Sequence, residues 1–417
     1  MNRILAVVSL VLLCLGIGCG GGKDGGGQVL VKVSPSTVSV IAGQTQQFTA
    51  TVTGAVNSAV AWSVSCSTTT CGAISSSGLY TAPSPIPSSA SVTVRAVSQE
   101  DTNISGTAAV TQVPVSVTIS PNAAVTLISA DTRQFSATVS NAPSGQDGYT
   151  WSVTGSGSFG AGGLYTAPAK VASDETVTVT VTSSFDTSKK ASTTVHLKAP
   201  IISLAPGDST IEGGGQLQFN PTVSYVPTGQ GGITWELTGS GTIAAGLYSA
   251  PSLVSAHQTA TVKAILDFDN TKSAQSVLTM DPVTLALSPD TATHYPSESR
   301  QFSVVVANHV NKGVTWNLSG LSCGGGACGT LDGNGLYSAP ASVSSEFQVD
   351  IAATSLADPT KFDTSVVTLK PITVTVSPKT ATVKIAATQQ FEASVQGGTN
   401  TNVIWSVSGT GCAGNAC

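Results

Sequence analysis

Charged side chains are scarce in this sequence. They make up 9% of its 417 residues and leave a net charge of −5, whereas an average soluble domain has about 25% charged residues. There is no basic cluster, so the chain lacks the electrostatic footprint of a nucleic-acid binder. No segment has the 3.6-residue apolar period of a helix either. These absences argue against a nucleic-acid partner and a helical fold. Much of the polarity of the chain comes instead from serine, threonine and 43 glycines.

Groups that could form a catalytic or metal centre are also few. The histidines fall at four different places in the repeats described below, with no paired carboxylate context; they are His196, His257, His294 and His309. A catalytic centre needs a nucleophile, a base and an orienting group that converge. We therefore predict surface histidines, no metal or cofactor, and no enzymatic activity. Residues 155–160 and 320–324 match the dinucleotide-binding and nucleophile-elbow patterns, but without the strand–turn–helix context that those motifs need.

The N-terminus carries an apolar run at residues 4–15, which follows a positive charge and is too short to span a bilayer. The next four residues, Gly16 to Cys19, resemble a bacterial lipoprotein signal, although that pattern usually has Leu where Gly16 stands. The resemblance implies that Cys19 is lipidated, with 1–19 as signal and 20–28 as a Gly-rich tether. An ordinary cleaved secretory signal is the alternative. We expect an exported protein, held by lipid in the cell envelope at the outer membrane or cell surface.

The rest of the chain repeats one module. An alternating strand ending in Pro is followed by Gln-Phe, by a strand with Trp, and by Gly-Leu-Tyr-Thr/Ser-Ala-Pro. We predict that the Phe, the Trp and the Leu-Tyr pair of Gly-Leu-Tyr form the centre of the core of each module, with the aromatic residues as markers of the repeat. They are Phe48, Trp62 and Tyr80; Phe135, Trp151 and Tyr165; Phe219, Trp235 and Tyr248; Phe302, Trp316 and Tyr337; and, in the last module, Phe391 and Trp405. The module boundaries predicted from the repeat are 29–112, 114–198, 199–280, 282–369 and 371–417, numbered here as modules 1 to 5.

Each module offers six or seven short alternating strands separated by turn signals. That pattern is typical of an antiparallel β-sandwich. The opening Ser-Pro strand, the Gln-Phe strand, the Trp-Ser strand and the Gly-Leu-Tyr-Thr-Ala segment resemble the bacterial immunoglobulin-like (group 2) domains of invasin- and intimin-type surface proteins. This resemblance implies an all-β tandem array of immunoglobulin-like sandwiches. It leaves the function open, because such modules serve as stalks, as adhesins and as accessory domains of enzymes.

Module 5 lacks its second half, because it stops at Cys417, which stands at the place of Cys328 in module 4. The missing strands would leave an open sandwich with an uncovered core. We interpret the sequence as a fragment or a frameshifted form of a longer protein.

Six cysteines form three pairs with the same spacing, each after the Trp of its module. In an exported protein they predict local disulfides, at Cys66–Cys71, Cys323–Cys328 and Cys412–Cys417. Closing such a short loop contributes only about 2 kcal/mol in the chain-entropy model. Zinc would need four ligands, and no histidine lies near these pairs in the sequence.

A polar turn recurs before the last strand of each module. It reads Phe-Asp at 185–188, 268–271 and 362–365, and Glu-Asp at 100–103. We interpret it as an Asx-type hairpin turn, in which Asp bonds its own backbone. The alternatives are a row of exposed Phe loops that contact a partner, and calcium at the module joints, for which one carboxylate per turn is a poor ligand set.

These observations favour a non-enzymatic stalk or adhesin, anchored to a membrane through lipid and directed at a host cell, a neighbouring cell or a polysaccharide surface. Carbohydrate binding is the alternative from another class, and it needs exposed aromatic platforms. A third possibility is that the modules are accessory to an exported enzyme whose catalytic domain lies outside this sequence.

Overall fold

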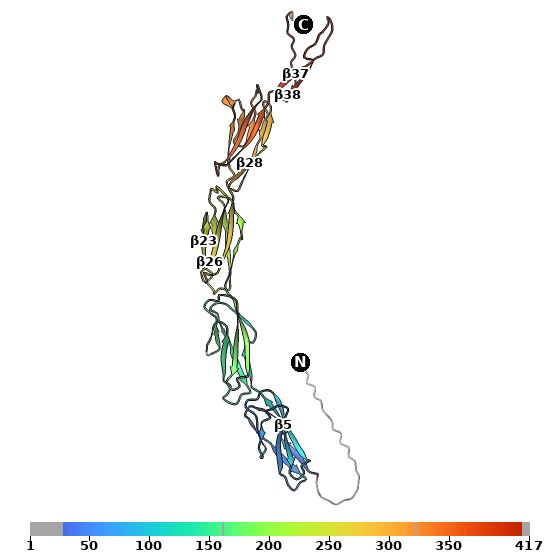
Figure 1. Cartoon of the computed structure of the whole chain (residues 1–417), viewed down its shortest axis with the longest axis vertical. Helices are drawn as coiled ribbons and strands as arrows, with labels where there is room; N and C mark the ends of the chain where they lie inside the picture. Colours follow the sequence, from blue (N-terminus) through green and yellow to red (C-terminus); the bar gives the residue numbers. More distant parts are fainter. Residues whose placement is uncertain (1–27, 161, 322, 411–417) are drawn as a thin grey trace. The chain divides into compact units, whose positions relative to one another are not determined.

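The computed structural model describes residues 28–160, 162–321 and 323–410. It divides into two compact units that meet between Lys198 and Ala199, the first containing modules 1 and 2 and the second modules 3 to 5. Regular structure in the described residues is β-strand, apart from one 3₁₀ turn, η1 (Gly324–Gly326). Figure 1 draws the strands as arrows and labels several of them. The all-β fold predicted from the alternating pattern is therefore confirmed.

Module 1 contains nine strand segments in three sheets. They are β1 (Leu30–Ser34), β2 (Thr37–Ile41), β3 (Thr45–Gln47), β4 (Thr49–Thr53), β5 (Val60–Cys66), β6 (Ala73–Ile74), β7 (Leu79–Thr81), β8 (Ala90–Ser98) and β9 (Ser105–Val113). One sheet has the order β2-β9-β8-β5, in which only β2 and β9 are parallel. Strand β1 pairs with β4, while β3, β7 and β6 form a three-stranded ladder. Together these strands make an immunoglobulin-like sandwich.

Module 2 repeats this topology strand for strand. Its segments are β10 (Ser116–Ser120), β11 (Val125–Leu127), β12 (Thr132–Gln134), β13 (Ser136–Ser140), β14 (Tyr149–Thr154), β15 (Ser158–Phe159), β16 (Leu164–Thr166), β17 (Glu175–Ser183) and β18 (Lys190–Leu197). The segment that matches the dinucleotide pattern thus runs into the short strand β15, and the next element in the described residues is strand β16 rather than a helix.

Modules 3 and 4 have the same order. Module 3 contains β19 (Ile201–Ala205), β20 (Ser209–Thr210), β21 (Gln216–Gln218), β22 (Asn220–Ser224), β23 (Ile233–Gly239), β24 (Thr242–Ala244), β25 (Leu247–Ser249), β26 (Gln258–Leu266) and β27 (Ser273–Met280). Module 4 contains β28 (Thr284–Ser288), β29 (Thr291–His294), β30 (Ser299–Gln301), β31 (Ser303–Ala307), β32 (Val314–Ser319), β33 (Thr330–Leu331), β34 (Leu336–Ser338), β35 (Phe347–Ser355) and β36 (Phe362–Leu369). Figure 1 shows β23 and β26 side by side, where they pair antiparallel.

There are more strand segments than the six or seven predicted, because two long strands are interrupted. The opening strand breaks at its Pro and continues in the four-stranded sheet, as β1 and β2 do around Pro35. The next strand breaks at the Phe of Gln-Phe: Phe48 separates β3 from β4 and donates its N–H to the carbonyl of Gly78 instead of joining the ladder of either strand.

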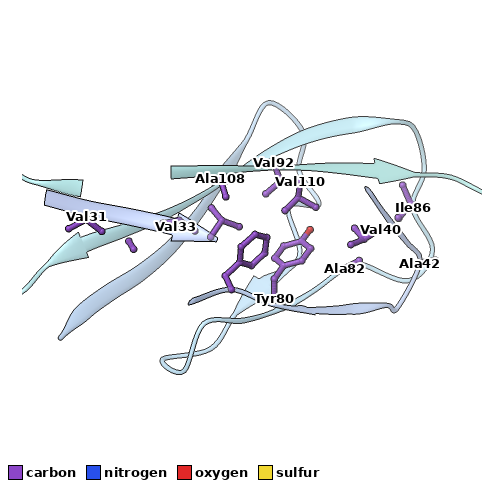
Figure 2. Packing of buried hydrophobic residues seen from close by; sticks show 13 residues of the cluster. Val31, Val33, Val40, Ala42, Tyr80, Ala82, Ile86, Val92, Ala108 and Val110 are labelled. Atoms are coloured by element: carbon purple, nitrogen blue, oxygen red, sulfur yellow. The ribbon is translucent and has the colours of Figure 1, made fainter. Parts of the chain in front are cut away.

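In modules 1 to 4, the core lies between the four-stranded sheet and the strands that pack against it. Figure 2 shows the core of module 1, where Val40, Val92 and Val110 come from the four-stranded sheet, Val31 comes from the β1-β4 pair and Tyr80 comes from the three-stranded ladder. The side chains alternate along β8 and β9, so every second residue enters the core. The recurring Phe and Tyr residues are the largest fully buried side chains. They are Phe48, Phe135, Phe219 and Phe302 with Tyr80, Tyr165, Tyr248 and Tyr337.

The structure places two other motif residues differently from the prediction. Each Trp of modules 1 to 4 is only half-buried, because its strand, such as β5 for Trp62, lies at the edge of the four-stranded sheet. The Leu of Gly-Leu-Tyr points outward, with Leu79 38% exposed. Adjacent residues of a strand face opposite sides, so Leu and Tyr cannot both enter the core.

In module 5, the described residues form one pair of strands, β37 (Thr373–Ser377) and β38 (Glu392–Gln396). Phe391 is half-buried, whereas Trp405 is 54% exposed and Val376 39% exposed. In the described part of module 5, no second sheet covers these side chains as it covers their counterparts in modules 1 to 4.

Candidate functional site

The Gln-Phe and Gly-Leu-Tyr motifs meet in one hydrogen-bonded clamp. In module 4, Nε2 of Gln301 donates to the carbonyl of Phe302 at 2.8 Å and to that of Asn334, next to Gly335, at 2.7 Å. The same two bonds recur in the other modules, from Gln47 to Phe48 and Ser77, from Gln134 to Phe135 and Gly162, and from Gln218 to Phe219 and Ala245. The Gln side chain thus satisfies the carbonyls left free where the strand breaks.

The Gly of Gly-Leu-Tyr is required by this clamp. Gly335 has φ +82°, and a Cβ there would lie 2.7 Å from the carbonyl oxygen of Phe302 and 2.6 Å from Cζ2 of Trp316. Gly78 and Gly246 have the same positive φ and the same close approach to a Phe carbonyl and a Trp ring. Only glycine adopts this conformation without strain and fits this space.

The Tyr hydroxyl fixes the loop that follows the Trp strand. Tyr337 donates to the carbonyl of Cys328 at 2.7 Å, and Tyr80, Tyr165 and Tyr248 each donate to the corresponding carbonyl at 2.8 Å. Burial raises the pKa of the Tyr337 phenol to about 12, and it also raises the pKa of the other three phenols. The polar groups that recur in these motifs are therefore engaged inside their own module.

Two of the predicted disulfides are present, Cys66–Cys71 and Cys323–Cys328. Each closes the loop whose carbonyl accepts the Tyr hydroxyl. The Cys412–Cys417 pair and the lipidation residue Cys19 lie outside the described residues.

The Asx turn is confirmed in modules 1 to 3 and was assigned to the wrong residues in module 4. Asp186 Oδ1 accepts the N–H and the hydroxyl of Ser188 at 3.1 and 2.6 Å, and Asp269 and Asp101 accept the N–H two residues on. In module 4, the turn is at Asp358, which accepts both groups of Thr360. Phe362 instead begins β36 and is 64% exposed. The Phe-Asp dipeptide of module 4 therefore has the same sequence as the turns of modules 2 and 3, but it lies in a strand.

The Phe loop of module 2 is part of a joint rather than a free surface. Phe185 packs against the core of module 1, and Nζ of Lys189 donates to the carbonyl of Pro87 at 2.6 Å. A shallow hollow at this joint is lined by Ile41 to Gln44 and Ser84 of module 1 and by Pro143, Ser144, Gln146 and Phe185 of module 2.

The prediction of surface histidines is wrong for two of the four. His294 and His309 are buried, with exposed fractions of 6% and 8%. Carboxylates also pair with two of the rings, which the sequence did not suggest: Nδ1 of His257 lies 2.6 Å from Asp281, and Nδ1 of His294 lies 3.3 Å from Glu298. His196 is exposed, and its Nδ1 lies 3.1 Å from the hydroxyl of Thr176.

None of these histidines belongs to a recognisable reaction centre in the described part of the chain. The His257–Asp281 pair is open to solvent, at 65% and 42% side-chain exposure, and no hydroxyl or thiol is among its hydrogen-bond partners in residues 28–160, 162–321 and 323–410. Over the same residues, no three His, Cys, Asp or Glu side chains gather where they could hold a metal ion. Nor does any described helix have the length and apolarity to cross a membrane.

No protein-family model matches the chain, and no curated protein is similar to it in sequence. Among solved structures, it is similar to three N-terminal domains of the outer capsid protein Hoc of bacteriophage RB49, with 11% identity, a TM-score of 0.27, and coverage of 62% of this chain and 99% of that one. It is also similar to invasin, described as a bacterial integrin-binding protein, with 14% identity, a TM-score of 0.22, and coverage of 84% and 80%. A third similar structure is protocadherin gamma B7 cadherin domains 1–4, with 12% identity, a TM-score of 0.23, and coverage of 81% and 100%. At these TM-scores the likenesses carry no argument about function.

Proposed function

We propose that this chain is a non-enzymatic bacterial cell-envelope lipoprotein whose immunoglobulin-like (group 2) modules act as a surface stalk or adhesin. The observation that carries this proposal is that the repeated residues make their contacts within their own module. The amide of Gln301, the backbone of Gly335 and the phenol of Tyr337 all bond or pack within module 4, and their counterparts do the same in modules 1 to 3. What the chain repeats is a scaffold, whereas a repeated binding or catalytic site would present its common polar groups to solvent.

Contacts between neighbouring modules of one unit support the stalk role. Phe185 and Lys189 fasten module 2 to module 1, and backbone hydrogen bonds of Gly213 fasten module 3 to module 4. Modules joined in this way, with only a few residues between their strands, transmit force and position better than modules on free linkers.

The anchor is tested by replacing Cys19 in cells that carry the full chain. Cys19→Ala should abolish covalent incorporation of a labelled fatty acid and release the protein from membranes. Cys14→Ala is the matched control, because Cys14 lies within the apolar run and should not affect lipidation. Unchanged labelling and membrane retention in Cys19→Ala would refute the lipoprotein assignment.

Surface display is tested separately by treating intact cells with a protease. A stalk that projects from the cell should lose modules 3 and 4 to the protease while a periplasmic marker stays intact. Protection of every module until the outer membrane is permeabilised would contradict a surface role. Binding of the purified chain to insoluble glycans would instead favour the carbohydrate-binding alternative.

A further inference from the structure

A single histidine ring spans the joint between modules 3 and 4. His309 lies in the loop between β31 and β32 and is 8% exposed. Its Nδ1 accepts the N–H of Asn311 at 2.9 Å, so this nitrogen carries no proton. Nε2 therefore carries the proton and donates it to the carbonyl of Ser252 in module 3, at 2.8 Å. The joint thus fixes one neutral tautomer, with both ring nitrogens satisfied.

Other contacts hold the same loop against module 3. The N–H of Gly213 donates to the carbonyl of Asn308 at 3.0 Å, and the N–H of Val310 donates back to the carbonyl of Gly213 at 3.1 Å. The ring also packs closely on this backbone, since a Cβ at Gly213 would lie 2.9 Å from Cδ2 of His309. Nζ of Lys312 pairs with Glu212 at 2.7 Å at the half-exposed rim.

We propose that this joint is a pH-operated latch, closed while the His309 ring is neutral and released when the ring is protonated. Protonation places a hydrogen on Nδ1, which then faces the N–H of Asn311, donor against donor. The same step puts a charge on a ring that is nine-tenths buried, which is unfavourable without a counter-ion. Opening the joint exposes the ring to water, where its charge is hydrated, and frees the ring to turn Nδ1 away from the N–H of Asn311.

Among the described residues around the joint, the ionisable groups do not supply a free counter-ion. Glu212, on the turn of module 3 that faces the loop, is paired with Lys312 of the loop itself. Asp281, on the segment that connects the modules, is paired with His257. The latch is therefore closed while the ring is neutral and loosens in acid, when the ring gains its proton.

The joint between modules 1 and 2 provides an internal comparison. Phe185 packs across this joint and Lys189 donates a hydrogen bond to the carbonyl of Pro87, while no histidine is among the described residues that line its hollow. Acid should therefore loosen the 3–4 joint before the 1–2 joint, and this changes the stiffness of the array at one defined place.

Amide hydrogen exchange of the full chain tests the latch directly, because the N–H groups of Gly213 and Val310 bond across the joint. After correction for the intrinsic rate, their protection should fall about tenfold or more between pH 7.5 and pH 5, since a buried hydrogen bond is lost and a donor is left unpaired. Core amides of β26 and β35 should keep their protection. Equal protection of Gly213 and Val310 at both pH values would overturn the proposal.

Two variants distinguish protonation of His309 from other effects of low pH on the joint. His309→Gln keeps a donor for the Ser252 carbonyl but does not titrate, so the pH dependence should disappear. His257→Gln is the control and should retain the pH dependence of the unmodified chain. Persistence of the dependence in His309→Gln would refute the latch. If His309→Gln opens the joint at every pH, NMR titration of the His309 ring in the unmodified chain tests the proposal instead. The midpoint of the ring titration must then coincide with the pH at which Gly213 and Val310 lose their protection; a different midpoint would refute the latch.

Discussion

His294 in module 4 occupies the core position that Val40 holds in module 1. Both side chains come from the strand that follows the opening Pro, and their strand partners are equivalent, Leu369 for His294 and Gln112 for Val40. Both are buried, at 6% and 2% exposure, yet Nε2 of His294 has no hydrogen-bond partner among the described residues. Its Nδ1 contacts Glu298. Module 4 therefore contains a buried polar atom that module 1 avoids.

Replacing His294 with the residue of module 1 should stabilise module 4. His294→Val removes an unsatisfied buried nitrogen, which costs about 1–3 kcal/mol, and loses one hydrogen bond worth about 1 kcal/mol, so a net gain of about 1 kcal/mol is expected. Exchange of the Val349 and Ile351 amides in the full chain measures it, because these core amides report the opening of their own module. Module 3 amides should not change. Faster exchange in the variant would show that the ring and Glu298 contribute more than Val can.

The positive φ of Gly335 predicts a large effect from a small substitution. Gly335→Ala places a Cβ within 2.7 Å of the Phe302 carbonyl and against Trp316 in a backbone conformation that alanine adopts poorly. We expect a loss of about 2–4 kcal/mol in the stability of module 4. Gly333→Ala is the matched control: it lies in the same turn, and its Cβ would meet nothing within 4 Å. Similar losses of stability in both variants would mean that any substitution in this turn destabilises the module, whether or not its Cβ meets the Phe302 carbonyl.

The buried tyrosines predict a loss of stability in alkali. The pKa of Tyr337 is raised to about 12 by burial, above the value of about 10 in an unfolded chain. A raised folded-state pKa means that the stabilising contribution is complete below pH 10 and is lost as the pH rises through 12. Unfolding of module 4 and ionisation of the phenol, followed at 295 nm, should therefore occur together. Tyr337→Phe should cost about 1–2 kcal/mol at neutral pH, because the Cys328 carbonyl loses its donor, but it should weaken this alkaline dependence. If the loss of stability in alkali were unchanged in Tyr337→Phe, a group other than the Tyr337 phenol would be its cause.

The sequence predicted the sandwich and most of its core because strand alternation and the repeat both point to Phe48 and Tyr80. It misplaced Trp62 and Leu79, since hydrophobicity alone does not tell which strand lies at a sheet edge or which face of β7 is covered. The turn at Asp358 was missed because the Phe-Asp dipeptide of module 4 lies in strand β36, after the turn and not within it. The His309 joint could not be predicted, because it depends on contacts between modules that no periodicity within one module records.

The disulfides should fasten loops without deciding the fold, and modules 2 and 3 show why. Tyr165 donates to the carbonyl of Ser156 at the same distance as Tyr80 donates to that of Cys71, although module 2 has no disulfide at this loop. Reduction of the full chain should therefore leave the core amides of modules 1 and 4 protected, with a cost of about 2 kcal/mol to these modules. Exchange should rise mainly in the loop around η1, while modules 2 and 3 serve as internal controls. Loss of core protection in module 4 on reduction would show that Cys323–Cys328 is needed for the fold.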